Sequence, residues 1–559
     1  MSADPTKETS SKTQADRSAL GNRMALGLLV CLAFGIRLTY AIQQHIAFGD
    51  EPCYVWLAQN LFGGHGYTYY AGTPELHFPP LFPISLGLLN YVVRDWEAVT
   101  RTAYVLFGSL IPLPIYLLGS AMYSKRAGLV SGLLAAVLPA FTSGFFFAET
   151  MSEPLFLLVA FSGLAFAYRA AVTKGLVSAA IAGAFLSLAI LTRSEGEVYF
   201  LAGFGLIVLV SLFPRPASLR RRVMQLAVYT GAFLAVASPY VLYLHSHTGK
   251  WALDTKSTTS YTTTRALVTQ DGIGFQRDMW GLNEKGEVHY YAHEFDQSLF
   301  ELLRGKYRDR VFSDIRANFW TAKSTFLRPW VCGRHMLALA LIGWIGAVLV
   351  RRRPSAEALH FLLIGAIAPV LIFFIRERFL YGLLLPVLLW AGCGLDLMAL
   401  AAEGWAAKRP RAAQLAVSMI LVALLGAASA YFAHQGYRHW KRKQLDQSEV
   451  LVAGDWLRTH TPPDAVLMVT GTEVAFHAGR RWLPVPAADH AQIIEYGRKR
   501  GATHLCLRGR YLERRPEQNA ELFEGAKDFP DLTLLVKSGA GDSPEKFVVY
   551  AIKNAAPAR

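Results

Sequence analysis

Four short charged segments lie at the ends of apolar stretches and contain the residues that could do chemistry. They are Asp50-Glu51, Glu149 with Glu153, Arg193 with Glu195, and Arg376 with Arg378. Charged side chains at a bilayer edge cost free energy, so carboxylates and arginines gathered on one face favour a reaction centre. The way the chain crosses the membrane decides whether these segments meet.

The composition is that of a multi-pass membrane protein. Of the 559 residues, 53% are hydrophobic and only 17% are charged, below the share typical of soluble chains. Apolar runs of roughly 20 residues, long enough to span a bilayer as a helix, recur from Met24 to Phe432. The net charge of +15 comes from Lys and Arg clusters between these runs. We therefore expect the protein to contact membrane lipid and not to bind nucleic acid.

The N-terminal segment and the cysteines add little chemistry. Residues 1–23 are polar and lack the apolar core and cleavage site of a removable signal. We therefore expect a cytoplasmic tail followed by an uncleaved anchor. The five cysteines show no CxxC motif and no metal-binding spacing, and the sequence leaves their pairing open.

The charge pattern predicts eleven spans with the N-terminus inside. Their ranges are Met24–Gln44, Thr100–Tyr123, Ala127–Phe147, Pro154–Val172, Gly175–Leu191, Val198–Phe213, Val223–Leu244, His335–Val350, Ala356–Ile375, Phe379–Leu400 and Ala412–Phe432. Every second turn is basic, as the positive-inside rule requires of inner turns. All four charged segments then face the outer side of a bacterial cytoplasmic membrane. The basic residues Arg438 and Lys441–Lys443 conflict with this topology, although late charges obey the rule weakly.

The predicted fold class is an α-helical polytopic membrane protein with a small C-terminal soluble α/β domain. A membrane domain is expected over residues 24–433, with outer loops at 45–98 and 245–334. Leu81–Val93 is too short to span, so we expect an interfacial or re-entrant helix there. From residue 446 to 559, helix-like runs alternate with β-like runs, which predicts an extracytoplasmic α/β domain. The β-like runs are Ala465–Val469, Thr503–Leu507, Leu532–Val536 and Phe547–Ile552. This domain contains no GxGxxG motif and no P-loop.

Asp50-Glu51 begins the first outer segment and is followed directly by Pro52. Because proline suits the first turn of a helix, one interpretation is an interfacial helix that is capped by one of these acids. The other interpretation is catalytic. A carboxylate in a partly desolvated cavity can act as a general base, because burial and neighbouring charges tune its pKa. Both hold together if capping also orients the acid.

His77, Glu195 and the pair Glu149 and Glu153 are candidates to bind a substrate or a cation. His77 opens a Pro-rich stretch, for which a rigid approach to the next helix is the favoured interpretation. Glu153 precedes Pro154 and would cap a helix on the simpler interpretation. Two carboxylates held near the membrane surface would otherwise bind a divalent cation or the hydroxyl groups of a polar ligand.

The outer arginines are candidates to bind phosphate. Arg193 lies in a tight hairpin, where an exposed pair with Glu195 or Glu197 is the simpler account. Arg376 and Arg378 suit a lipid phosphate, because the planar guanidinium matches phosphate oxygens. Snorkelling toward the headgroups is the alternative for both, and it is the favoured interpretation for Arg37 within the first span.

These motifs in this order resemble the GT-C glycosyltransferases, in particular bacterial relatives of the protein O-mannosyltransferases and of the lipid A aminoarabinose transferase. The resemblance covers residues 24–400. It is carried by Asp50-Glu51, Pro79-Pro80-Leu81-Phe82-Pro83, Met151-Ser152-Glu153-Pro154, Leu191-Thr192-Arg193 and Arg378-Phe379-Leu380-Tyr381. It implies transfer of a sugar from a polyprenyl-phosphate donor to a lipid, glycan or protein acceptor on the outer face.

The resemblance also implies roles for individual residues. The family's catalytic acid falls on Asp50, with Glu51 beside it, and its second acidic position falls on Glu153 or, less securely, Glu149. Its donor-phosphate residues fall on Arg193 and Arg378, less securely Arg376. Ser194 follows Arg193 where many relatives have proline, which leaves the role of Arg193 open.

The chemistry agrees with this assignment. A departing phosphate needs positive charge more than an acid, and the acceptor hydroxyl needs one base, so a single displacement would invert the anomeric centre. No cofactor is required, and a divalent cation stays open because the chain has no DxD motif. A transporter or flippase of lipid-linked sugars and an outer-face glycan polymerase or ligase are the alternatives.

Overall fold

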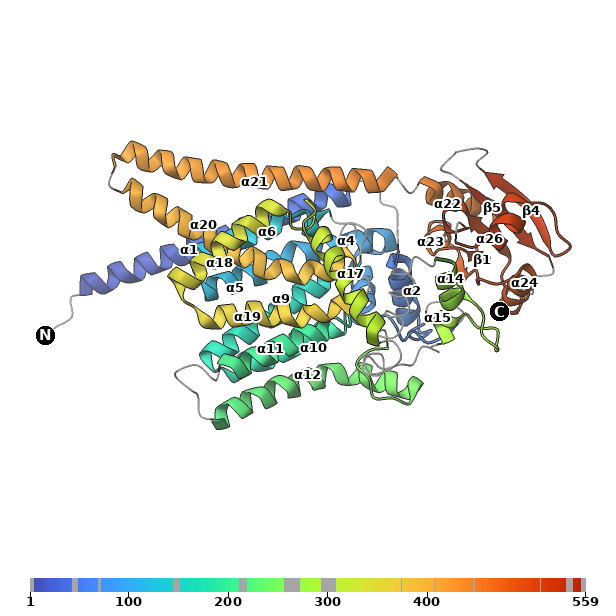
Figure 1. Ribbon diagram of the computed structural model, residues 1–559, viewed down its shortest axis with the longest axis horizontal. Helices are drawn as coiled ribbons and strands as arrows, with labels where there is room; N and C mark the ends of the chain where they lie inside the picture. The colour runs from blue at the N-terminus through green and yellow to red at the C-terminus, as the bar shows by residue number, and fades with distance from the viewer. Residues whose placement is uncertain are drawn as a thin grey trace.

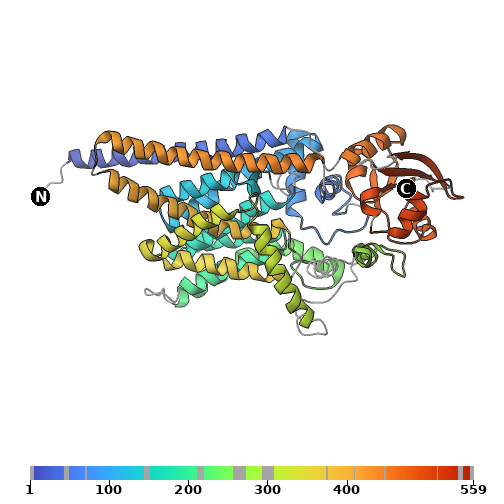
Figure 2. The same ribbon diagram turned by 45° about the horizontal axis from the view of Figure 1, so that its top comes forward.

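The structure is a computed structural model with two parts. Residues 5–445 form a helical bundle, and residues 448–553 form what we term the C-terminal unit, which lies at the end of the bundle farthest from the N-terminus (Figures 1 and 2). The residues described are 5–42, 49–68, 72–143, 151–210, 219–255, 272–292, 308–372, 375–407, 409–445, 448–512, 514–538 and 546–553.

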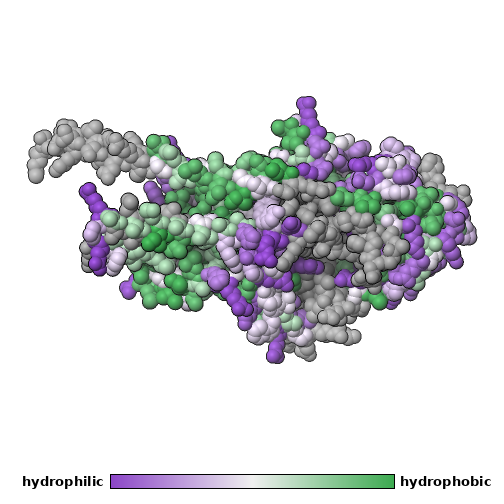
Figure 3. Space-filling view, turned by 90° about the horizontal axis from the view of Figure 1, so that it is seen from above, coloured by the Kyte–Doolittle hydropathy of each residue, from purple (hydrophilic) through white to green (hydrophobic). Residues whose placement is uncertain are grey.

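Six helical stretches in the described residues are long and apolar enough to cross a membrane. They are Leu20–Ala41, Trp96–Met122, Glu153–Thr173, Leu219–Thr248, Arg334–Arg351 and Glu377–Ala406. Four shorter apolar helices are Leu81–Val93, Leu176–Ile190, Gly196–Val210 and Pro354–Ile367. Figure 3 shows apolar side chains gathered over the bundle, as expected of a surface in contact with lipid. The chain is a multi-pass membrane protein, and the number of eleven crossings stays a prediction.

The bundle helices follow the predicted spans closely. Their bounds are α1 (Pro5–Ala41), α4 (Trp96–Leu110), α5 (Pro112–Met122), α6 (Lys125–Val137), α7 (Pro139–Thr142), α9 (Glu153–Thr173), α10 (Leu176–Ile190), α11 (Gly196–Val210), α12 (Leu219–Thr248), α18 (Arg334–Gly346), η1 (Ala347–Arg351), α19 (Pro354–Ile367), η2 (Ala368–Ile372), η3 (Glu377–Leu383), α20 (Leu384–Ala406) and α21 (Arg411–Leu445).

The structure adds two details to the predicted spans. The predicted span Thr100–Tyr123 is divided at Ile111, because Pro112 has no N–H to continue the helical hydrogen bonds. The segment expected as a separate polar tail, residues 1–23, is helical from Pro5 and continuous with the first span. Lys and Arg in this stretch favour helix, so polarity alone did not mark its start.

The prediction that the Arg37 side chain extends toward the lipid headgroups is wrong. Its side chain is fully buried and donates hydrogen bonds to three carbonyl oxygens, at 2.9 Å from Ala33, 3.3 Å from Ala136 and 2.8 Å from Phe141. The last two acceptors belong to α6 and α7, so Arg37 ties α1 to the neighbouring helices. An arginine inside a span is tolerated when carbonyl oxygens take its N–H groups.

Helices outside the spans surround the end of the bundle nearest the C-terminal unit. They are α2 (Glu51–Phe62), α3 (Leu81–Val93), α14 (Gly272–Trp280), α15 (His289–Ala292) and α17 (Arg308–Phe326). The predicted helix at 81–93 is confirmed, and its Leu88, Tyr91 and Val92 side chains are exposed. Exposed apolar side chains on a helix too short to span fit an interfacial position.

Ion pairs tie the helices together at the opposite end of the bundle. Asp396 of α20 pairs with Arg351 and accepts a hydrogen bond from Ser124 at 2.7 Å. Arg126 of α6 pairs with Glu403 at 2.9 Å. Arg126 and Arg351 belong to the clusters predicted to face the cytoplasm, so the charged motifs of the sequence divide between the two ends.

The C-terminal unit contains a five-stranded mixed sheet in the order β2-β1-β3-β5-β4. Strands β1 (Val466–Val469), β2 (Arg481–Pro484) and β3 (His504–Arg508) are parallel, whereas β5 (Phe547–Ile552) pairs antiparallel with β3 and with β4 (Leu532–Ser538). Its helices are α22 (Ser448–His460), α23 (Glu473–His477), α24 (His490–Lys499), α25 (Gly509–Leu512), α26 (Pro516–Gln518) and η4 (Asn519–Glu524). The sequence prediction missed β2, an edge strand of four residues.

Candidate active site

Residues from all four charged segments meet at the end of the bundle that faces the C-terminal unit. Asp50 precedes α2, Glu153 is the first residue of α9, Arg193 lies between α10 and α11, and Arg378 lies in η3. Pro52 and Pro154 stand in the first turns of α2 and α9, as predicted. The prolines start these helices beside each acid and thereby place both carboxylates at the end of the bundle.

The charges form a continuous alternating chain. Arg378 Nη1 lies 3.8 Å from Asp50 Oδ2 and 3.8 Å from Glu153 Oε1. Glu153 Oε1 lies 2.7 Å from Arg193 Nη1, and Arg193 Nη2 lies 2.6 Å from Glu195 Oε1. Asp50, Arg378, Glu153, Arg193 and Glu195 therefore act as one electrostatic unit. We call these five residues the charge chain.

Arg193 is the buried centre of the charge chain. The predicted pair with Glu195 is confirmed, but it is not an exposed pair, because the Arg193 side chain is only 8% exposed. Burial lowers the pKa of Arg193, yet the Glu153 and Glu195 carboxylates raise it by more, and the net shift is upward. The guanidinium is thus permanently charged and is already engaged by two carboxylates.

Asp50 and Glu51 differ sharply in exposure. The Asp50 side chain is 34% exposed, whereas Glu51 is 1% exposed. Asp50 occupies the predicted position before the first turn of α2, but its side chain makes no capping hydrogen bond. The Ser152 side chain at the start of α9 makes none either. Asp50 is the acid that a substrate can reach.

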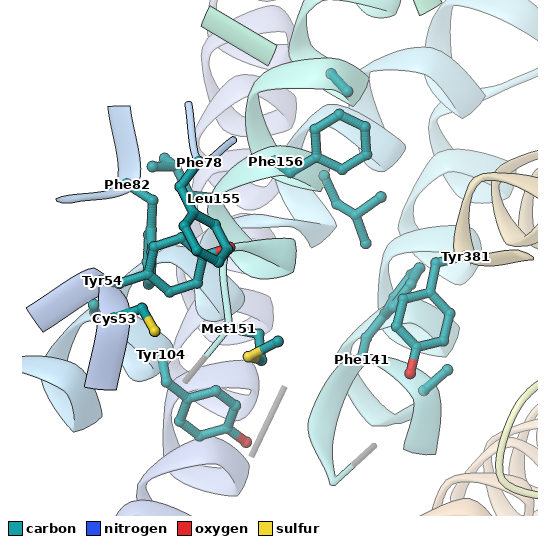
Figure 4. Packing of buried hydrophobic residues seen from close by; sticks show 14 of the residues in the cluster. Cys53, Tyr54, Phe78, Phe82, Tyr104, Phe141, Met151, Leu155, Phe156 and Tyr381 are labelled. Atoms are coloured by element: carbon teal, nitrogen blue, oxygen red, sulfur yellow. The ribbon is translucent and has the colours of Figure 1, made fainter. Parts of the chain in front are cut away.

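An aromatic and hydroxyl layer supports the charge chain. Tyr54, one turn after Asp50 in α2, has its hydroxyl 3.2 Å from the buried Ser152 hydroxyl, which in turn accepts a hydrogen bond from Arg193 at 3.3 Å. The Tyr54 ring packs edge-on against Phe78 at 5.1 Å and Phe82 at 5.0 Å, as Figure 4 shows. Burial and the nearby Asp50 charge raise the pKa of Tyr54, so its phenol stays protonated.

The sequence reasoning missed Tyr54 and Ser152, although both carry a readable signal. Tyr54 is four residues after Asp50, a spacing that places it on the same helical face. Ser152 lies within the Glu149–Pro154 segment that the prediction singled out. Their hydroxyl groups link α2 to α9 and thereby fix the distance between the two acidic motifs.

His77 belongs to a neighbouring polar cluster and not to the charge chain. Glu75, which the sequence reasoning also missed, is buried and accepts backbone hydrogen bonds from His77 at 2.5 Å and Phe78 at 3.0 Å. The His77 ring is buried and stacks on Tyr290 of α15 at 4.7 Å. Glu75 thus stabilises the turn before α3, and its position two residues before His77 is the only sequence signal.

The remaining candidates are placed differently. Arg376 is more exposed than Arg378, and Glu377 between them accepts hydrogen bonds from Arg328 at 3.1 Å and the Trp330 indole at 2.9 Å. Glu149 lies outside the described residues. Within the described ranges, no three His, Cys, Asp or Glu side chains gather so that they could hold a metal ion.

Two solved structures share this architecture over most of the chain. One is ArnT from Cupriavidus metallidurans bound to undecaprenyl phosphate, with a TM-score of 0.58, 13% identity, and coverage of 96% of this chain and 99% of that chain. The other is the oligosaccharyltransferase AglB from Archaeoglobus fulgidus with an inhibitory peptide and a dolichol-phosphate, with a TM-score of 0.52, 12% identity, and coverage of 88% and 70%. The fold is that of the GT-C membrane glycosyltransferases, which confirms the predicted resemblance.

A family model agrees with this class. The model described as dolichyl-phosphate-mannose-protein mannosyltransferase matches residues 77–243, a range that includes Glu153 and Arg193 but neither Asp50 nor Arg378. No curated protein sequence matches the chain significantly. The inclusion of Asp50 and Arg378 in the candidate site therefore rests on geometry and on the sequence pattern.

Proposed function

We propose that the protein transfers a monosaccharide from a polyprenyl-phosphate donor to an acceptor on the outer face of a bacterial cytoplasmic membrane. The observation that carries this proposal is the pair formed by Asp50 and Arg378. An accessible carboxylate and a guanidinium lie 3.8 Å apart at the end of the bundle, where a lipid phosphate and a polar acceptor can both approach. The ArnT structure contains undecaprenyl phosphate and the AglB structure a dolichol-phosphate, and both lipids carry a phosphate on a polyprenol, as the proposed donor does.

The proposed reaction is a single displacement. Asp50 takes the proton of the acceptor hydroxyl as that oxygen forms a bond to the anomeric carbon. The bond between the anomeric carbon and the phosphate oxygen breaks, and its electron pair stays on the phosphate. Arg378 stabilises the negative charge that grows on this oxygen. The anomeric centre is inverted because attack and departure occur on opposite faces.

The ion-pair distances support different roles for Arg193 and Arg378. Arg193 binds Glu153 and Glu195 at hydrogen-bond distances of 2.7 and 2.6 Å, so it orients Glu153. Arg378 lies at 3.8 Å from each of its two acids and is the arginine placed to bind the donor phosphate. Arg376 beside it extends the positive surface, and the buried Glu51 supports the start of α2.

The acceptor is a lipid, a glycan or a protein with a free hydroxyl or amino group. A panel of polyprenyl-phosphate monosaccharides supplied to the purified protein tests the proposal. We expect Asp50-dependent consumption of one donor and release of the polyprenyl phosphate. Movement of a lipid-linked sugar across vesicles without consumption would instead establish the transporter alternative, and a requirement for an oligosaccharide donor would establish a polymerase or ligase.

The variant Arg378→Lys should raise the KM for the donor about tenfold, and Arg378→Gln should lower kcat/KM by about 100-fold. Lysine keeps the charge but loses the planar fork that holds two phosphate oxygens, whereas glutamine loses both. Initial rates measured against donor concentration give both values.

Arg328→Lys is the matched control, since Arg328 also lies near η3 and is bound to Glu377. Its kinetic constants should stay at wild-type values. A wild-type donor KM and kcat in Arg378→Gln would show that Arg378 does not bind the phosphate.

A further inference from the structure

The C-terminal unit makes a direct hydrogen bond to the segment that carries Asp50. The hydroxyl of Thr472, just before α23, donates to the backbone carbonyl of Gly49 at 3.1 Å. Gly49 immediately precedes Asp50 and has a positive φ of 63°, a conformation that glycine adopts without strain. A flexible residue next to the catalytic acid needs an outside contact to hold one conformation.

A second contact fixes the helix that follows Asp50. The Trp56 ring of α2 stacks on Trp482 of β2, with centroids 6.1 Å apart and planes 11° apart. Phe476 of α23 packs against the same ring at 6.1 Å. The Trp482 indole donates to the Val469 carbonyl at 3.2 Å, so its orientation is set by the sheet. Edge strand β2 is thus covered by α2.

The C-terminal unit also contacts the segment that contains α14 and α15. The backbone N–H of Ala487 donates to the Trp280 carbonyl at 2.7 Å, and the buried Arg515 binds Gln276 at 2.9 Å. Trp280 stacks on Tyr290 at 5.5 Å, and Tyr290 stacks on His77 as described above. The contacts of the unit therefore converge from two directions on the surroundings of Asp50.

The local structure of α2 does not fix the Asp50 carboxylate. Its side chain makes no capping bond, and its ion pair with Arg378 is long at 3.8 Å. A Cβ atom placed on Gly49 would lie 3.9 Å from the Met151 side chain, which is an ordinary van der Waals contact. The hydrogen bond from Thr472 and the Trp56 stack therefore act together with the Tyr54–Ser152 contact to hold the Asp50 segment in place.

We propose that the C-terminal unit positions the catalytic acid, with Thr472 and Trp482 as positioning residues that hold residues 49–56 against the charge chain. This inference rests on the proposed role of Asp50. The unit then affects the rate through the position of Asp50, because a shift of the Asp50 carboxylate by about 1 Å would cost a large part of the rate.

Thr472→Val tests the inference, because it removes the hydroxyl and keeps the shape of the side chain. We expect kcat to fall about tenfold or more while the donor KM stays within about twofold of wild type. Thr472→Ser restores the hydroxyl and should restore kcat. Thr459→Val is the matched control, since the hydroxyl of the exposed Thr459 bonds only to residues of its own helix α22 within the part of the chain that the structure describes.

A thiol label gives a readout that does not depend on catalysis. Cys53 is buried three residues after Asp50, and burial with the charges of Asp50, Glu75 and Glu473 raises the pKa of its thiol. In a Cys31→Ser background, maleimide should modify Cys53 faster in Thr472→Val than in the parent protein. Cys506 of β3 is fully buried and reports unfolding of the unit. Its protection should not change.

Trp56→Leu removes the second contact, the stack on Trp482, without altering the C-terminal unit. It therefore tests the inference even if Thr472→Val unfolds the unit and exposes Cys506. Lower kcat and faster Cys53 labelling in Trp56→Leu support the inference. Wild-type kcat with protected Cys53 in both variants overturns it. If Asp50→Asn retains full activity while Thr472→Val still exposes Cys53, the proposed function fails and the positioning contact stands.

Discussion

Replacing Asp50 with Asn should lower turnover by about 10²–10⁴-fold while the protein still folds and inserts. Asparagine has the shape of aspartate, but its neutral amide cannot take the proton of the acceptor hydroxyl at neutral pH. The 34% exposed side chain makes no capping bond, so the helix loses no local support. Initial rates with a saturating donor measure the loss, which should fall on kcat more than on KM.

Asp455→Asn is the matched control, because it makes the same change on an exposed face of the C-terminal unit. Its turnover should equal that of the wild type. Glu51→Gln separates the two neighbouring acids: a buried carboxylate that supports the helix should affect stability more than chemistry. Unchanged turnover in Asp50→Asn would remove Asp50 from the mechanism.

Arg193→Met should destabilise the protein by about 3–5 kcal/mol, the second large effect we expect. The change leaves the Glu153 carboxylate, 2% exposed, and the neighbouring Glu195 without their closest counter-ion. A buried charge that loses its partner costs far more than the ion pair itself contributes. Unfolding in detergent, followed against denaturant or temperature, measures the loss.

The double variant Arg193→Met with Glu153→Gln should recover part of this stability, because the buried charge is removed with its partner. Arg458→Met is the control: Arg458 pairs with Asp455 at 2.6 Å on an exposed surface, and its loss should cost less than about 1 kcal/mol. Equal losses in Arg193→Met and Arg458→Met would mean that burial does not govern the charge chain.

The sequence predicts the parts of this fold that depend on local pattern. Helix starts at Pro52 and Pro154 and the strand Phe547–Ile552 all agree with the structure, because proline geometry and β-branched runs act locally. The arginine and acidic motifs could be assigned to one face by counting spans. That assignment needs only the alternation of charge between turns.

Other features depend on distant contacts and could not be predicted. Arg37 looks like any arginine near a span end, and only the carbonyl groups of α6 and α7 explain its burial. The different ion-pair distances of Arg193 and Arg378 arise from the packing of four helices. Strand β2 is too short to show a pattern, and it exists because it pairs with β1.

The hydrogen bond between Thr472 and Gly49 joins residues 423 positions apart, which bears on the order of biosynthesis. At a synthesis rate of about 5–20 residues per second, the ribosome makes the Asp50 segment tens of seconds before the segment that contacts it. During this interval, the nascent chain lacks the segment that contacts Gly49 and α2. A translocation apparatus that releases the chain early would yield an inserted protein whose acid has no fixed place.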